Sequence, residues 1–131
     1  MGNITENEYY ELSFDAIKNR VLWTMKGFWD SMDVAPDFFR DWDKVMKSIK
    51  EGFTVLADLS EVKTWPEDVY EVNMKVQKRL MEKGCKKVAV IIQSVIVKFQ
   101  IKQATELAGM LGIIRMSEDT EDARTWLEEK S

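Results

Sequence analysis

The sequence predicts one α/β domain, residues 1–131, built on a mainly parallel β-sheet. Two short and nearly continuous apolar segments, residues 53–59 and 87–92, have the composition of strands that are covered on both faces. A segment with helical spacing of its apolar residues follows each of them, and an alternating segment precedes them. Consecutive strand and helix units of this kind fold into parallel sheets with right-handed crossovers.

The first expected element is a β-hairpin. Apolar and polar residues alternate over residues 10–16 and again over residues 21–25, and the polar residues 18–20 between them mark the turn. One-sided polarity is typical of strands with one solvated face. We therefore expect residues 10–16 to form an antiparallel strand at the N-terminal edge of the sheet.

The first two helices alternate with the two buried strands. Residues 36–50 carry apolar side chains at spacings of three and four, between a proline and a glycine. The same spacing marks the second helix over residues 66–83, which stops at Gly84. Each helix is expected to cover the sheet with its apolar face.

The third helix carries its apolar residues over positions 97–111 and is expected to end at Gly112, directly before a short strand at 113–116. A last helix follows, with Asp119 or Thr120 as its N-cap. Its periodicity places three residues on the buried face: Ala123, Trp126 and Leu127. The complete prediction is a five-stranded sheet with four helices.

Composition and charge narrow the classes of function. The formal net charge of -4 argues against binding nucleic acid, which needs a concentrated basic surface. No apolar run approaches the roughly 20 residues that span a bilayer, so we expect no integral membrane segment and a cytoplasmic protein. The chain has one cysteine and no histidine, which removes an internal disulfide, histidine-based catalysis and most zinc sites. We expect no cofactor and no metal.

Three stretches resemble the STAS superfamily, the sulfate transporter and anti-sigma-factor antagonist domains, and in particular its SpoIIAA-like bacterial branch. They are ADLSEV at residues 57–62, KKVAVIIQ at 86–93 and EDTEDARTWL at 118–127. These are mainly packing motifs and none is a catalytic signature, so the resemblance implies a SpoIIAA-like fold more firmly than a function. The sequence leaves the oligomeric state open, a dimer included.

In anti-sigma-factor antagonists, an Asp-Ser-Ser-Gly step follows the segment similar to ADLSEV, and its second serine is the phosphoacceptor. The resemblance lays that step on four residues of this chain: Pro66, Glu67, Asp68 and Val69. Asp68 therefore stands where the family carries its phosphate, either as a permanent mimic or as an ordinary acidic residue in a first helical turn. Phosphorylation of Ser60, which lies before the step, is not expected.

Two alternatives describe how the second helix begins. Thr64 and Glu67 have the spacing of a capping box, in which each side chain accepts from a backbone N–H at the helix start. Pro66 disfavours helical geometry at Trp65, so the helix begins instead at the proline in the second alternative.

The candidate binding site lies at the carboxyl ends of the parallel strands, where ligands usually bind in open α/β sheets. The residues expected there form an aromatic rim with polar groups: Phe28, Trp29, Asp58, Ser60, Trp65, Gln93 and Ser94. Trp29 and Trp65 fall just outside apolar strands, so they either contact a ligand or fold down over the ends of the core. Asp58 lacks the partner that a general base needs, and the simpler interpretation is that it accepts N–H groups of its own loop.

Two classes of function follow. The first is a non-enzymatic regulatory or protein-binding module that docks a partner through the loop after Leu59 and the helix at 66–83, with Asp68 and Ser94 at the contact. The second is a carrier of a small apolar ligand or lipid, held by the aromatic rim, since the fold is similar to CRAL-TRIO lipid carriers. Cys85 beside two lysines is either a reactive thiol or a small residue at a turn.

Overall fold

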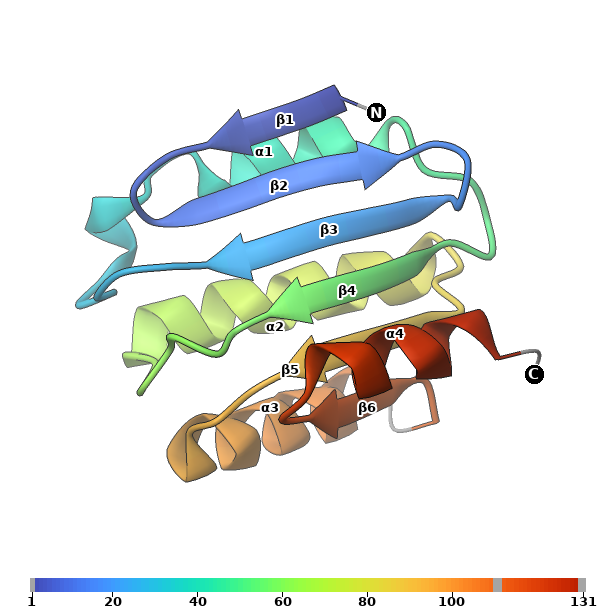
Figure 1. Ribbon diagram of the computed structural model, residues 1–131. Helices are drawn as coiled ribbons and strands as arrows, with labels where there is room; N and C mark the ends of the chain where they lie inside the picture. The colour runs from blue at the N-terminus through green and yellow to red at the C-terminus, as the bar shows by residue number, and fades with distance from the viewer. Residues whose placement is uncertain (1, 110–111, 130–131) are drawn as a thin grey trace.

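The computed structural model describes residues 2–109 and 112–129, and these residues form one six-stranded sheet. The strands are β1 (Gly2–Glu6), β2 (Tyr10–Asp15), β3 (Arg20–Met25), β4 (Thr54–Asp58), β5 (Lys87–Ile91) and β6 (Ile114–Ser117). Their order in the sheet is their order in the chain (Figure 1). β1, β2 and β3 pair antiparallel, whereas β3 to β6 pair parallel. The α/β class with a mainly parallel core is confirmed.

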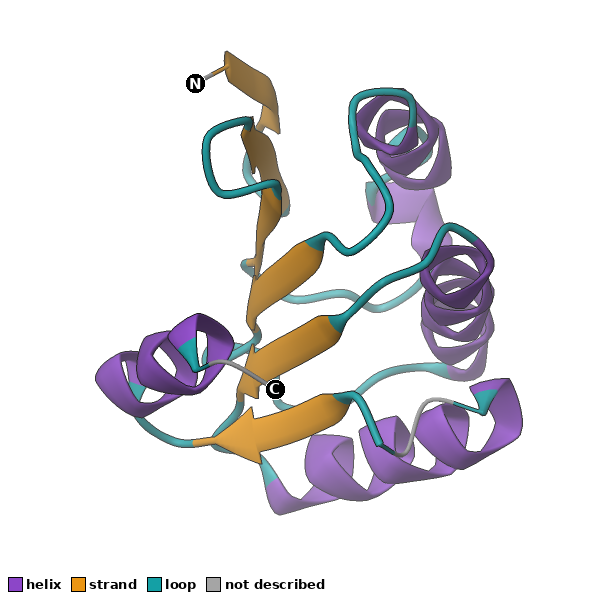
Figure 2. Ribbon diagram, turned by 90° about the vertical axis from the view of Figure 1, so that its right-hand side faces the viewer, coloured by secondary structure: helices purple, strands orange, loops and turns teal. Residues whose placement is uncertain are grey.

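The helices divide unequally between the two faces of the sheet. They are α1 (Phe38–Met46), α2 (Glu67–Glu82), α3 (Val95–Ala108) and α4 (Thr120–Glu128), with a 3₁₀ turn, η1 (Met32–Val34), before α1. Helices α1, α2 and α3 lie on one face, and α4 lies on the other (Figure 2). Each parallel strand is added on the same side of its predecessor, so right-handed crossovers must place all three connecting helices on one face. Among the described residues, α4 connects to no later strand, so the crossover rule does not fix the face on which it packs.

The larger core lies between the sheet and α1 to α3, and its centre is aromatic. Trp23 of β3 packs edge-on against Trp42 of α1, with ring centroids 5.3 Å apart. The smaller core joins α4 to the opposite face through five buried residues: Leu56, Ala89, Ile91, Ala123 and Leu127. β5 is buried along its whole length because helices cover it on both sides.

Two strand predictions need correction. β1 was not expected, because its sequence GNITE lacks the alternation that marks a half-buried strand. It pairs with β2 and takes the edge position, so residues 10–15 form an inner strand and the sheet has six strands rather than five. Helix α4 reaches β3 only at its margin, through Leu22 and Arg20. Among the described residues, no helix covers the same face of β2, which explains the one-sided polarity of that strand (Figure 2).

The third and fourth helices also differ in detail from the sequence prediction. α3 ends at Gly109, whose φ of +73° gives the left-handed C-cap, three residues before the expected Gly112. Leu111, assigned to the same apolar face, lies outside the described residues. Asp119 is the N-cap of α4, as one alternative predicted, and its carboxylate accepts from the N–H of Asp122 at 3.2 Å. Trp126 is only half-buried, at the border of the smaller core.

In the described part of the chain, no helix combines the length and the apolar character needed to cross a membrane.

Candidate functional site

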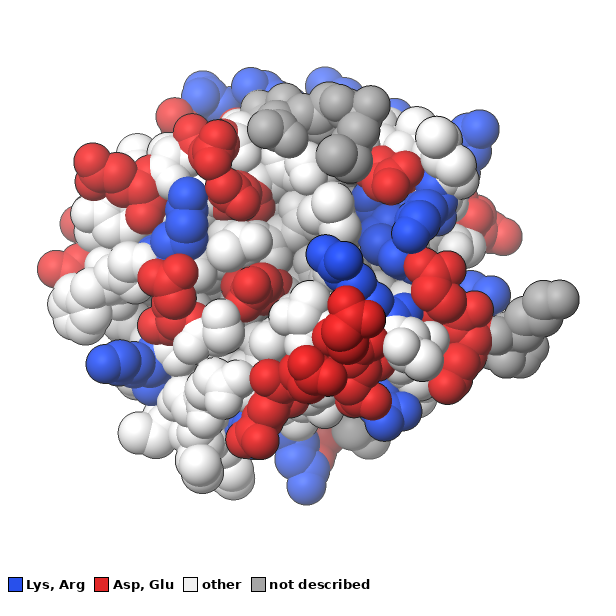
Figure 3. All heavy atoms as spheres, in the orientation of Figure 1, with Lys and Arg blue, Asp and Glu red and all other residues white. Residues whose placement is uncertain are grey.

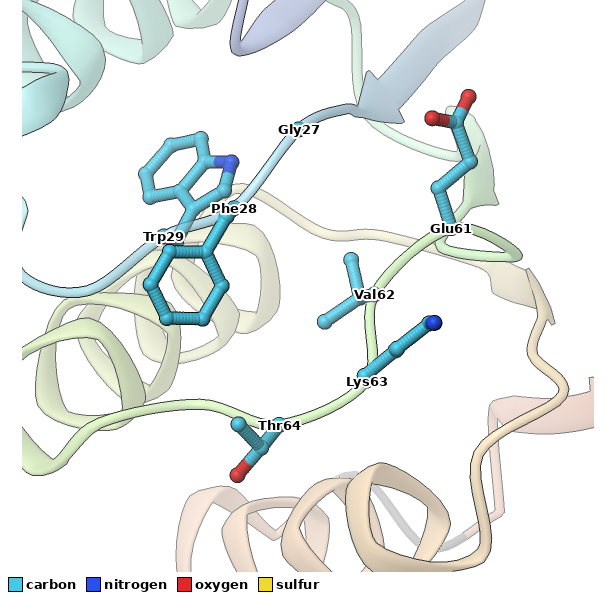
Figure 4. A pocket seen from close by; sticks show the side chains of 7 residues that line it. All are labelled: Gly27, Phe28, Trp29, Glu61, Val62, Lys63 and Thr64. Carbon is cyan, nitrogen blue, oxygen red and sulfur yellow. The ribbon is translucent and has the colours of Figure 1, made fainter.

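A cavity of about 340 Å³ opens at the carboxyl ends of β3 and β4. The residues after β3, Gly27 to Trp29, form one wall, and the residues after β4, Glu61 to Thr64, form the other (Figure 4). We call this space the strand-end cavity. It lies at the edge of the sheet where the sequence placed the binding site.

The first wall is shaped by a glycine turn. Gly27 has a φ of +70°, which a residue with a side chain rarely adopts. Of the two residues that follow it, Phe28 is 72% exposed and Trp29 is 2% exposed. The Trp29 indole N–H donates to the carbonyl of Lys26 at 2.8 Å, which holds the ring against the core.

The second wall is fastened to α3 by two polar side chains. Ser94, the N-cap of α3, donates its hydroxyl to the carbonyl of Lys63 at 2.8 Å. The side-chain amide of Gln100 accepts from the N–H of Trp65 at 3.2 Å and donates to the carbonyl of Trp65 at 2.9 Å. A side chain that matches both backbone groups of one residue fixes the loop as a strand partner would. The sequence analysis did not single out Gln100.

Asp58 and Ser60 form a local turn at the start of this loop. One carboxylate oxygen of Asp58 accepts from the backbone N–H of Ser60 at 3.0 Å and from its hydroxyl at 2.7 Å. The simpler interpretation of Asp58 is therefore confirmed, because both donors belong to its own loop. The pair shapes the entry to the loop and does not line the strand-end cavity.

Asp68 lies in the first turn of α2 and braces a different loop. Its carboxylate accepts from the backbone N–H of Met32 at 2.8 Å, so it ties α2 to η1. α2 begins at Glu67 with Pro66 at the N-cap position and no side-chain cap, so the capping box of Thr64 and Glu67 is wrong. The alternative, in which the helix begins at the proline, is confirmed.

The expected aromatic rim needs correction. Both tryptophans belong to the larger core: Trp65 is 4% exposed and does not line the strand-end cavity, and Trp29 lines that cavity but is only 2% exposed. Trp29 packs against neighbouring aromatic rings, including Phe38 with centroids 5.3 Å apart. Such rings bury a large apolar area, which favours folding them over the core ends. The exposed aromatic side chain at the strand-end cavity is Phe28.

A second exposed apolar group lies on the first two turns of α3. Val95 is 77% exposed, Ile96 60% and Phe99 70%. Figure 3 shows a region without charged residues at the lower left, where α3 begins in Figure 1. The signal in the sequence was the run VIVKF, which is more apolar than one helix face can bury. Ser94 links this region to the Lys63 wall of the strand-end cavity.

Cys85 lies at the other end of the sheet, just before β5, and is 8% exposed. Burial raises the pKa of its thiol to about 12, against a weaker opposing effect of a hydrogen bond with the backbone of Lys87. A thiol of this pKa is protonated at neutral pH and is a poor nucleophile. Of the two interpretations of Cys85, the structure therefore supports a small structural residue at a turn rather than a reactive thiol.

No family model matches the chain, and no curated protein matches it. The fold is similar to the crystal structure of an uncharacterised protein of the DUF3478 family, with a SpoIIAA-like fold, from Shewanella loihica PV-4. The two structures superpose with a TM-score of 0.65 over 94% of this chain and 97% of that chain, at 16% sequence identity. The similarity establishes a SpoIIAA-like fold, as the three sequence stretches predicted.

Proposed function

We propose that this chain is a non-enzymatic, STAS-like binding module that docks a protein partner at the carboxyl end of its sheet. The observation that carries the proposal is the exposure of large apolar side chains at that end, on both sides of the Glu61–Thr64 wall. Exposed apolar side chains that gather in one region, rather than singly, mark interaction surfaces.

The proposed contact surface still includes the loop after Leu59, but the apolar side chains beside that loop differ from those expected from the sequence. Phe28 and the start of α3 replace the two tryptophans as apolar contacts, because they are exposed and the tryptophans are not. In the helix at 66–83, the Asp68 carboxylate is engaged with Met32. The bonds from Ser94 and Gln100 support a loop that is held in shape before a partner arrives, which lowers the entropy cost of binding.

The non-enzymatic part of the proposal rests on chemistry. Among the described residues, two hydroxyls donate to carboxylates at this edge, Ser60 to Asp58 and Ser117 to Asp122. No histidine is present in the sequence to relay a proton between such groups. Among the described residues, no cluster of acidic or sulfur ligands could hold a metal ion.

The test uses a photo-crosslinking amino acid at position 28, with the same residue at position 17 as the matched control. Ile17 is 98% exposed and apolar but lies in the turn between β2 and β3, at the opposite end of the sheet. In cells of the organism that makes this protein, the crosslinker at position 28 is expected to form an adduct with one defined protein. The substitution Phe99→Asp should abolish that adduct. Equal products from both positions, or insensitivity to Phe99→Asp, would contradict docking at this end.

The second candidate is a carrier of a small apolar ligand. Its support is the size of the strand-end cavity, about 340 Å³, which lies at the lower end of the roughly 300 to 1,000 Å³ typical of ligand pockets. Native mass spectrometry of freshly purified protein separates the two candidates. A retained small-molecule mass that Phe28→Asp abolishes favours the carrier, and a mass equal to that of the chain favours the docking module.

A further inference from the structure

Helices α1 and α2 lie next to each other on one face of the sheet, and a groove of about 620 Å³ runs between them (Figure 2). Seven residues line this groove, and five of them are cationic: Arg40, Asp43, Lys44, Met46, Lys47, Arg79 and Lys83. We call this space the basic groove. A chain with a formal net charge of -4 thus gathers positive charge from two helices that are distant in the sequence.

The spacing of these cations is unfavourable for the helices that carry them. On α1, Lys44 follows Arg40 by four residues and Lys47 follows Lys44 by three. On α2, Lys83 follows Arg79 by four. Like charges at these spacings lie on the same side of a helix and destabilise it. An anion in the basic groove would relieve this repulsion on both helices.

Neighbouring carboxylates balance some of the cations but not all of them. Among the described residues, Lys47 and Lys83 have no carboxylate within ion-pair distance. They are the C-cap residues of α1 and α2, where each helix end contributes roughly half a negative charge. The helix ends therefore balance only part of the two ammonium charges. The other three cations form ion pairs: Arg40 with Asp37, Lys44 with Asp41, and Arg79 with Asp43.

We propose that the basic groove binds a phosphate-bearing small molecule, whose phosphate group contacts Lys47 of α1 and Lys83 of α2. A phosphate monoester carries a charge of about -1.5 to -2 at neutral pH and offers three acceptor oxygens. This charge matches two ammonium groups, each of which has three donors. Both lysines are exposed, and their flexible stems allow the two ammonium groups to reach one anion.

The groove has the size and the fixed geometry of a small-molecule site. Its volume lies within the roughly 300 to 1,000 Å³ typical of ligand pockets. The Arg79 guanidinium pairs with Asp43 and lies 4.4 Å from the ring centroid of Phe39, so it joins α2 to α1 beside the lysines. Arg40, whose pair with Asp37 is exposed and therefore weak, is available for a second phosphate.

This inference is independent of the proposed function, because the basic groove shares no lining residue with the strand-end cavity. The test is a titration of the intact, ¹⁵N-labelled chain followed by NMR, with ATP, inorganic triphosphate, adenosine and sulfate as separate probes. The ionic strength is held at about 0.15 M, where distant charges are screened. ATP and triphosphate are expected to give saturable shifts at the amides of Lys47 and Lys83. Tighter binding of ATP would identify a nucleotide, and equal binding would identify the phosphate chain as the ligand.

A charge-matched pair of variants makes the test specific. Lys47→Gln with Lys83→Gln should raise the Kd for triphosphate about tenfold or more, because it removes hydrogen bonds to a charged group. Lys75→Gln with Lys78→Gln changes the net charge equally at exposed positions of α2 outside the groove, and should leave the Kd unchanged. Equal weakening by both double variants, binding of sulfate as tight as that of triphosphate, or the absence of saturable binding would overturn the proposal.

Discussion

Phe28 and Trp65 illustrate how weakly the identity of a residue determines its environment. Both are aromatic and both follow a buried parallel strand, yet Phe28 is 72% exposed and Trp65 4%. The two residues differ in their backbone surroundings: Phe28 follows Gly27, whose φ is positive, and the Gln100 side chain bonds both backbone groups of Trp65. Neither feature follows from local periodicity, because each joins segments that are distant in the chain or depends on a positive φ.

The burial of Trp65 implies a large loss of stability on its replacement. Trp65→Ala should lower the free energy of unfolding by about 3 to 5 kcal/mol, the range for removing a buried aromatic side chain. Phe28→Ala, the exposed control, should change it by no more than about 0.5 kcal/mol. Equilibrium denaturation in urea measures both. Equal midpoints for Trp65→Ala and the parent would show that the ring does not pack in the core.

Cys85 gives a prediction of reactivity. Because burial raises the pKa of the thiol to about 12, the native protein should react slowly with a thiol reagent such as DTNB at neutral pH. The same protein unfolded in urea should react at once. A native rate close to that of the unfolded chain would mean that Cys85 is accessible and activated.

At the scale of elements, α4 is held to the sheet by charged side chains as well as by its apolar face. Lys87 of β5 is 7% exposed, and its ammonium donates to the carbonyls of Trp126 at 2.8 Å and Glu129 at 2.9 Å. It thereby satisfies free carbonyls at the end of the helix and opposes the negative end of the helix dipole. At the other side of the helix end, Glu128 binds Arg20 of β3 at 3.0 Å.

Replacing the buried lysine tests this cap. Lys87→Met keeps the aliphatic chain and removes the charged donor, so it should lower the free energy of unfolding by about 1.5 to 3 kcal/mol. Lys86→Met, at the exposed neighbouring position, is the control and should have little effect. Hydrogen exchange should also show faster opening of α4 in the Lys87 variant alone. An unchanged protection pattern would exclude the cap as the cause.

Trp126 belongs to the same element, and its half-buried position lowers the expected cost of its removal. The Lys87 ammonium lies 5.0 Å from the ring centroid, so the side chain contributes through a cation–π contact as well as through burial. Trp126→Ala should therefore destabilise the fold by less than the roughly 3 to 5 kcal/mol of a fully buried aromatic residue. A cost in that range, measured by urea denaturation, would show that the ring is deeper than described.

Glu128 makes part of the stability depend on pH. The hydrogen bonds from Arg20 and then Lys18, with the charges of both, lower the pKa of Glu128 below its ordinary value of 4.5. The stabilisation is fully present above the unfolded value and is lost as the pH falls through the lower folded value. In Glu128→Gln, stability should therefore fall less between about pH 5 and about pH 3 than in the parent. Glu121→Gln, in the exposed first turn, should retain the dependence of the parent, and identical profiles for all three proteins would contradict the assignment.

At the scale of the molecule, the sequence predicted the elements whose apolar residues recur with a regular period, and it missed the elements that lack such a period. The buried strands β4 and β5 and all four helices were recognised because their apolar patterns face a layer of the fold. β1 was missed because the sequence GNITE has no such pattern. The edge of the sheet that bears the candidate site was predicted from topology alone. Its exposed side chains were not, since Phe28 and the start of α3 depend on how the loops are fastened.

The sequence placed the candidate site at the carboxyl ends of the strands because ligands usually bind there in open α/β sheets. The strand order shows that this general reason does not apply here. Crevices in open α/β sheets form where the strand order reverses and adjacent loops diverge to opposite faces. Here β3 to β6 follow one another without reversal, so the fold supplies no such crevice. The strand-end cavity exists because two particular loops leave space between them, which ties the candidate site to loop residues rather than to the architecture.

The same unreversed order has a consequence for biosynthesis. Every strand pairs with the one made immediately before it, so each newly emerged segment finds its pairing edge already formed as the chain leaves the ribosome. Each parallel pairing must wait until the crossover helix between its two strands has been made, and parallel pairings of this kind form slowly. The sheet is expected to grow in the direction of translation, and an unpaired parallel edge is exposed only until the next crossover helix and strand are complete.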